Sequence, residues 1–131
     1  MSDYEALRRL GDLGRKIERR RGKDPYPRPT GPAPTMEELR RRRDEITGVA
    51  QTHGASAVRV FGSVARGDAR PGSDLDVLVE MGEGPSLFEQ TALQSDLEDL
   101  LQCPVHVVTT NGLKYARDYT REQIEHEAVP L

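Results

Sequence analysis

Two aspartates, Asp74 and Asp76, follow a Gly62-Ser63 pair after ten intervening residues. Apolar residues flank both groups, as in two strands joined by a loop. Alternate residues of a strand share a face, so we expect both carboxylates to point the same way. Mg²⁺ prefers one or two carboxylates together with phosphate oxygens, and a Gly-Ser turn offers backbone N–H groups and a hydroxyl to phosphate. The pattern therefore predicts a site for a metal ion and a nucleoside triphosphate.

Gly62, Ser63 and Arg66 are the candidates for holding the phosphates. Because glycine has no side chain, its backbone can approach a triphosphate closely, and Ser63 could donate its hydroxyl and its N–H to phosphate oxygens. A simpler interpretation is a strand-to-helix turn in which Ser63 caps the next helix; the paired aspartates at this spacing favour phosphate binding. Arg66 could bind a phosphate or a partner's carboxylate, or it could be an ordinary surface arginine.

The pattern resembles the signature GSx10DxD of the DNA polymerase β-like nucleotidyltransferases. The longer string FGSVARG…GSDLDVLV is most similar to the minimal nucleotidyltransferases, the MntA-type antitoxins that pair with HEPN-domain toxins. The similarity covers about residues 36–131, including the closing EAVPL. It implies an α/β fold with a polymerase β-like nucleotidyltransferase core, in which a small mixed sheet is flanked by helices.

The same resemblance implies a function. Asp74 and Asp76 would bind Mg²⁺, as two ions in the family mechanism, and ATP would be the substrate. The protein would be the antitoxin of a HEPN/MNT-type toxin–antitoxin system that transfers AMP to a tyrosine of the HEPN ribonuclease toxin and so silences it. The chain is too short for a helical acceptor-binding domain, so an acceptor on another protein fits its size.

Three other functions stay open at this point. The chain could be a catalytically lapsed antitoxin that neutralises its toxin by contact alone. It could be a nucleotide-sensing regulatory domain. It could also be a transferase that acts on a small molecule.

His106 stands where the resemblance implies a third carboxylate, in the segment Val105-His106-Val107-Val108. Its side chain is expected to point away from Val105 and Val107, toward the face that carries the aspartates. A neutral imidazole could replace the missing carboxylate as a base or serve as a weak ligand, since Mg²⁺ strongly prefers oxygen. Alternatively, His106 marks an active site that has lapsed.

The remaining elements are expected to place this site on an α/β core. Strands are predicted over residues 57–61, 75–80 and 105–108. Helices are predicted before, between and after them, each with a start signal. The expected helix features are a capping box at Thr35–Glu38, a helix continuing through Val49, a second capping box at Ser86–Glu89, a turn at Asn111-Gly112, and a last helix capped at Thr120.

The first 34 residues are expected to be separate from the domain at 35–131. Residues 4–21 carry a stripe of leucines and an isoleucine typical of an amphipathic helix, and residues 24–34 hold five prolines, which indicates an extended linker. Residues 1–43 hold 13 Lys and Arg against 7 acids, whereas the rest hold 6 against 15. We expect this basic end to be a solvated helix face or a patch for an acidic partner. Self-association through the helix is a further possibility. We do not expect nucleic acid as a direct substrate.

Composition adds few constraints. The single Cys103 excludes an internal disulfide and is expected to be buried. His53, at a helix end, is expected to interact with that helix terminus, and the acids around Asp96, Glu98 and Asp99 are expected to form a solvated helix face. No apolar run is long enough to cross a membrane, so a cytoplasmic protein without a membrane partner is expected.

Overall fold

The computed structural model describes residues 29–82, 87–113 and 118–131. In chain order its elements are α2 (Met36–Arg41), α3 (Arg43–Thr52), β1 (Ala55–Phe61), α4 (Gly62–Arg66), β2 (Leu75–Met81), α5 (Leu87–Leu101), β3 (Val105–Thr109), α6 (Thr110–Leu113), α7 (Asp118–Glu127) and β4 (Val129–Pro130). The predicted helix at 4–21, residues 24–28 of the proline-rich segment and the Ser86 cap lie outside the described residues.

The strands form one mixed sheet in the order β3-β2-β1-β4. β2 and β3 are parallel, whereas β1 runs antiparallel to both β2 and β4. A parallel pair needs a crossover connection, and α5 supplies it. The α/β fold with a small mixed sheet flanked by helices is therefore confirmed.

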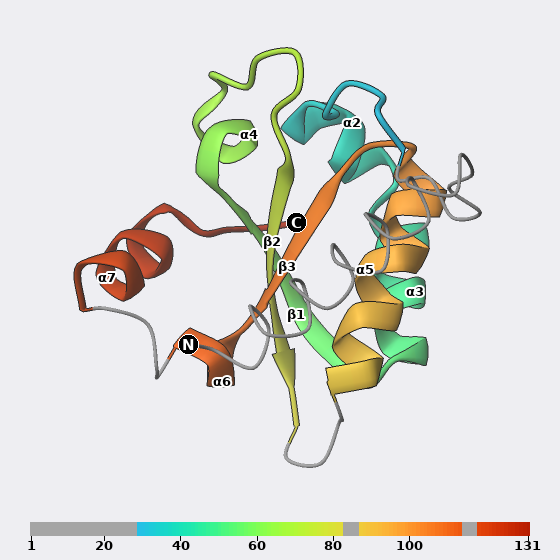
Figure 1. Cartoon of the computed structure of the whole chain (residues 1–131), viewed down its shortest axis with the longest axis vertical. Helices are drawn as coiled ribbons and strands as arrows, with labels where there is room; N and C mark the ends of the chain where they lie inside the picture. Colours follow the sequence, from blue (N-terminus) through green and yellow to red (C-terminus); the bar gives the residue numbers. More distant parts are fainter. Residues whose placement is uncertain (1–28, 83–86, 114–117) are drawn as a thin grey trace, which may run out of the picture.

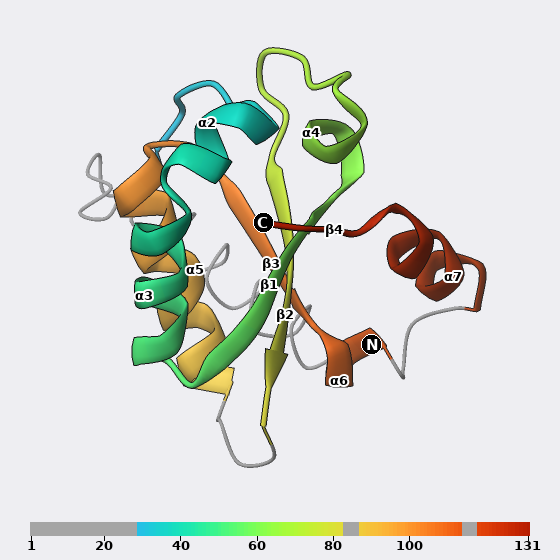
Figure 2. The same cartoon turned by 180° about the vertical axis from the view of Figure 1, so that it is seen from behind.

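Two helical layers cover the two faces of this sheet. Helices α3 and α5 lie together on one side, and α6 and α7 lie on the other (Figures 1 and 2). We call the first side the α3/α5 face and the second the site face. The main core fills the α3/α5 face, where Val77 and Val107 of the strands meet Leu93 and Leu97 of α5, all nearly inaccessible to solvent. A smaller cluster of Phe61, Leu78 and Leu113 fills part of the site face.

The strand alternation behaves as predicted, because Leu75, Val77 and Val79 all turn into the main core. The helix predicted from the Thr35 cap through Val49 is instead two helices, since it is broken at Arg42 into α2 and α3. The Arg42 side chain donates from Nη1 to the carbonyl of Leu100, 3.2 Å away, and so ties the break to the end of α5. The predicted capping box is confirmed: the Glu38 N–H donates to the Thr35 hydroxyl, and the Thr35 N–H donates to the Glu38 carboxylate.

Two local predictions near the C-terminal end are wrong. The Asn111-Gly112 pair lies inside the short helix α6, because Thr109 accepts the Gly112 N–H at 2.9 Å and so caps a helical turn there. Thr120 does not start the last helix, since α7 already begins at Asp118.

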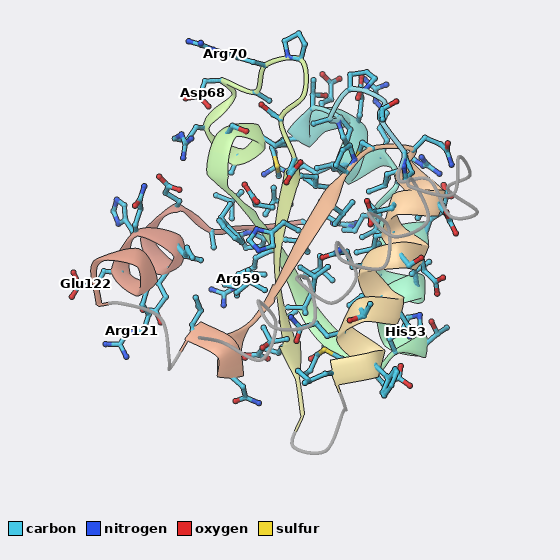
Figure 3. All side chains as sticks on the ribbon, viewed as in Figure 1. His53, Arg59, Asp68, Arg70, Arg121 and Glu122 are labelled. Atoms are coloured by element: carbon cyan, nitrogen blue, oxygen red, sulfur yellow. The ribbon has the colours of Figure 1, made fainter. Side chains whose placement is uncertain are left out.

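Two other predictions about polar residues are only partly right. His53 does close α3, but its ring binds two acids of α5, Glu89 and Asp96, at 2.9 and 2.6 Å; Figure 3 shows His53 beside that helix. Glu98 is buried, with 4% of its surface exposed, so the acidic side of α5 is only partly solvated.

Candidate active site

Asp76 and His106 meet on the site face because β2 and β3 are parallel and in register. Asp76 is the direct neighbour of His106 across that strand pair. His106 Nδ1 lies 3.2 Å from Asp76 Oδ1, which is hydrogen-bond distance. Both side chains are about three-quarters buried, with 28% and 23% exposed. The prediction that His106 shares the face of the aspartate is confirmed for Asp76.

Gly62 lies against the same aspartate from the other neighbouring strand. It follows Phe61, whose register partner on β2 is Asp76, and its φ of +73° is in the left-handed region that favours glycine. A Cβ built on Gly62 would collide with Asp76 Oδ2. The missing side chain therefore lets the Asp76 carboxylate pack directly against the backbone of the Gly-Ser turn.

Asp74 lies just before β2, where the chain approaches the start of β3. The Leu75 N–H donates to the carbonyl of Pro104 at 2.9 Å and joins the two strand starts.

Cys103 is fully buried, as predicted. Burial first, and then the charges of Glu98 and Asp74, raise the pKa of its thiol to about 11, so this cysteine stays protonated and is a poor nucleophile.

Ser63 is in the first turn of α4, directly after Gly62. Phe61 is the N-cap of this helix and supplies no side-chain hydrogen bond, so Ser63 does not cap it. The carbonyl of Ser63 accepts the N–H of Asp68 at 2.9 Å, which closes the turn at the end of α4. Within the described residues, the Ser63 hydroxyl neither donates nor accepts a hydrogen bond. That hydroxyl is available to a ligand.

Arg66 ends α4 and binds two carboxylates of its own chain. Its Nη1 lies 3.0 and 3.1 Å from the two oxygens of Glu127, and its Nε lies 3.3 Å from Asp68. The hydrogen bond to Asp68, followed by that to Glu127, raises the pKa of the guanidinium, which is charged in any case. Asp68 lies on the loop between α4 and β2 (Figure 3).

The donor set fits a magnesium ion that is shared with phosphate. Asp76 and Asp74 offer carboxylate oxygens, the ligand type that Mg²⁺ prefers, and Gly62 brings the backbone of the Gly-Ser turn against Asp76 Oδ2. Within the described ranges, no three acidic, histidine or cysteine side chains are grouped closely enough to hold a metal alone. A bound ion would therefore need oxygens from the nucleotide, as the sequence pattern indicates.

Sequence reasoning missed two charged residues near this site. Glu127 was visible only as part of the closing EAVPL, and nothing local linked it to Arg66. Arg59 is a partly buried residue of β1, and Figure 3 places it between the sheet and α7. The alternation of β1 was the available signal for Arg59, since it lies two residues before Phe61.

Comparisons with known proteins identify the family of this chain. The model of the nucleotidyltransferase domain family matches residues 38–131. A "putative protein adenylyltransferase" of Methanocaldococcus jannaschii is 35% identical over 96 residues, which is 73% of this chain and 97% of that protein. The protein adenylyltransferase MntA of Thermococcus cleftensis is 43% identical over 79 residues, covering 54% of this chain and 80% of that protein.

Comparison with solved structures also assigns the chain to the nucleotidyltransferase fold. A "putative minimal nucleotidyltransferase" has a TM-score of 0.65 and 44% identity over 77% of this chain and all of that chain. A toxin–antitoxin complex with AMP-PNP has a TM-score of 0.55 at 19% identity, covering 66% of this chain and 69% of that one, and so shares the fold. The chain belongs to the nucleotidyltransferase domain family, as a minimal nucleotidyltransferase of the polymerase β-like superfamily. None of the helices in the described residues is long and apolar enough to span a membrane.

Proposed function

We propose that this chain transfers AMP from ATP to a tyrosine hydroxyl of a HEPN-type toxin and thereby acts as its antitoxin. The observation that carries the proposal is the placement of Gly62 against Asp76, because it brings the Gly-Ser turn into contact with one of the two predicted metal ligands. The names of the relatives support protein as the acceptor. The structural neighbours that are toxin–antitoxin complexes support the kind of partner.

In this proposal, each residue of the site has one task. The backbone and hydroxyl of Gly62-Ser63, with Arg66, bind and orient the triphosphate. Asp74 and Asp76 would hold Mg²⁺, which when bound would neutralise phosphate charge and favour ionisation of the attacking hydroxyl. The hydroxyl oxygen bonds to the α-phosphorus, and the bond from that phosphorus to the α,β-bridging oxygen breaks. Pyrophosphate leaves, and the proton of the hydroxyl passes to solvent water.

His106 is assigned to orient Asp76. If Nδ1 carries the proton, it donates to Asp76 Oδ1 and fixes the carboxylate, so that Oδ2 stays against the backbone of Gly62. A histidine here supplies no additional negative charge, in contrast to a carboxylate. The site would then work with two carboxylates and with oxygens from the nucleotide.

The direct test is transfer of label from α-labelled ATP to a purified HEPN-type partner in the presence of Mg²⁺. Asp74→Asn and Asp76→Asn should each reduce labelling at least a hundredfold, because charge stabilisation of this kind is worth several kcal/mol. Glu80→Gln is the matched control, since Glu80 is exposed on the same strand, and it should label normally. A tight complex with no label in the wild type would instead identify a binding-only antitoxin.

A further inference from the structure

Glu127 fixes Arg66 more firmly than the other acid that binds it. Both Glu127 oxygens accept from Arg66 Nη1, at 3.0 and 3.1 Å, and the Glu127 side chain is only 18% exposed, against 62% for Asp68. Gln123, one turn earlier in α7, donates to Glu127 Oε1 at 3.3 Å. The Glu127 carboxylate is therefore itself held in place.

The segment that carries Glu127 is anchored to the strand that leads into the Gly-Ser turn. Ile124 and Ala128, on either side of Glu127, pack on the cluster that contains Phe61. The next two residues form β4 and pair with β1, and the Leu131 N–H donates to the carbonyl of Val58 at 3.3 Å. Glu127 and Gly62 are thus parts of the same packed unit.

The carboxylates of Asp68 and Glu127 accept hydrogen bonds from only some of the N–H groups of the Arg66 guanidinium. Nε donates to Asp68 and Nη1 to Glu127, and over 29–82, 87–113 and 118–131 no acceptor takes a hydrogen from Nη2. We propose that Glu127 is a positioning residue, which holds Arg66 at the end of α4 so that its remaining N–H groups meet the triphosphate. This inference rests on the proposed function, since it takes ATP as the ligand of the Gly-Ser turn.

The physical reason is preorganisation. Arginine has a long side chain that loses much rotamer freedom when it is fixed on a ligand. When the fold has already fixed that side chain, binding loses less freedom and the affinity is higher. Glu127 acts through Arg66 and does not need to touch the nucleotide.

The test is calorimetric binding of a non-hydrolysable ATP analogue with Mg²⁺ to the full chain. Glu127→Gln keeps the size of the side chain but removes its charge, and it should weaken binding by about threefold to tenfold, as expected for part of a charged hydrogen bond. Glu125→Gln is the matched control on the same helix, since Glu125 is exposed and should leave the affinity unchanged. Glu127→Asp, which withdraws the oxygens from Arg66, should also weaken binding and serves if the first variant fails to fold.

A double-mutant cycle separates positioning from a general effect on the fold. In an Arg66→Met background, Glu127→Gln should cause no further loss of affinity. An equal loss in that background would overturn the proposal, as would unchanged binding in Glu127→Gln. Tighter binding in Glu127→Gln would show that the carboxylate competes with the phosphates for Arg66, which also overturns it. A wild type that binds no analogue would refute the proposed function itself, and this inference with it.

Discussion

At the residue scale, the site depends on a contact that only glycine permits. Gly62 has φ +73°, and any Cβ there would collide with Asp76 Oδ2. Asp76 is held from the opposite side by His106. The carboxylate therefore has little freedom to move, which suits a metal ligand that must be in place before the nucleotide arrives.

Gly62→Ala should damage both stability and nucleotide binding. The left-handed backbone alone costs about 1–3 kcal/mol for a residue with a Cβ, and the collision should push Asp76 out of place. Gly67→Ala is the matched control, because Gly67 has a similar φ of +82° but nothing within 4 Å of the Cβ position. Denaturant unfolding should show a loss in both variants, with the larger loss in Gly62→Ala because of the collision, whereas Mg²⁺-dependent binding of an ATP analogue should fall only in Gly62→Ala. Equal binding losses would contradict the role given to the Asp76 contact.

His106→Asp should raise the labelling rate, most of all at low Mg²⁺. The change would place a third carboxylate beside Asp76, and a denser set of oxygen ligands binds Mg²⁺ more tightly. The measurement is the labelling rate of the HEPN-type partner across a Mg²⁺ titration. If the wild type is inert and the variant active, the natural chain is a binding-only antitoxin; if the variant is slower at every Mg²⁺ concentration, the aspartate does not substitute for the histidine at this position.

At the scale of elements, one histidine clamps two helices of the α3/α5 face. His53, at the end of α3, lies between Glu89 and Asp96 of α5 and is only 14% exposed. The hydrogen bond to Asp96, followed by that to Glu89, raises the pKa of the imidazole above its ordinary value of 6.5. The folded chain therefore holds this proton more tightly than the unfolded chain does.

The clamp should make stability depend on pH. Its contribution is fully present below about pH 6.5, the ordinary histidine value, and is lost as the pH rises through the raised pKa of His53. We expect up to about 1 kcal/mol from partly exposed pairs of this kind. Thermal unfolding at pH 6 and pH 8 should show this loss in the wild type and in the control His126→Gln, but not in His53→Gln. A slope that persists in His53→Gln would assign the effect to other groups.

Elements with a local pattern could be predicted from the sequence, whereas their pairing could not. Alternation identified Leu75, Val77 and Val79 as core residues, and the Thr35 cap followed from residue types three positions apart. The contact of Asp76 with His106 depends on which strands are neighbours and in which register, and no local pattern records that. The Arg66–Glu127 pair spans 61 positions, so its partner was equally hidden. The two-residue strand β4 is too short to show any periodicity.

At the scale of the whole molecule, the described segment before α2 is in contact with the rest. Ala33 packs against the main core. Ala33 and Pro34, with Val64 and Ala65 of α4, also line a cavity of about 400 Å³. The boundary between residues 34 and 35 stays a prediction, and these contacts indicate how to test it.

Two truncations should differ in stability. Removal of residues 1–28 should leave a folded domain with its melting temperature little changed, because the predicted linker separates that helix from the core. Removal of residues 1–34 should still leave a folded domain but cost on the order of 1 kcal/mol more, through the lost burial of Ala33 and its neighbours. Calorimetric melting of both chains is the measurement. Unfolding of the shorter deletion would show that the first helix is part of the core.

The pairing of β1 with β4 has a consequence for how the molecule folds. It joins Arg59 to Pro130, the largest separation along the chain of any strand pair in the described sheet. Closing so long a loop costs entropy before any contact is gained, so distant pairings tend to form late. The early product of folding would then be a β1-β2-β3 sheet with the Gly-Ser turn and both aspartates but with Arg66 still unanchored. Because the interactions of α7 and β4 would be absent from the transition state, weakening them should speed unfolding and leave the folding rate almost unchanged.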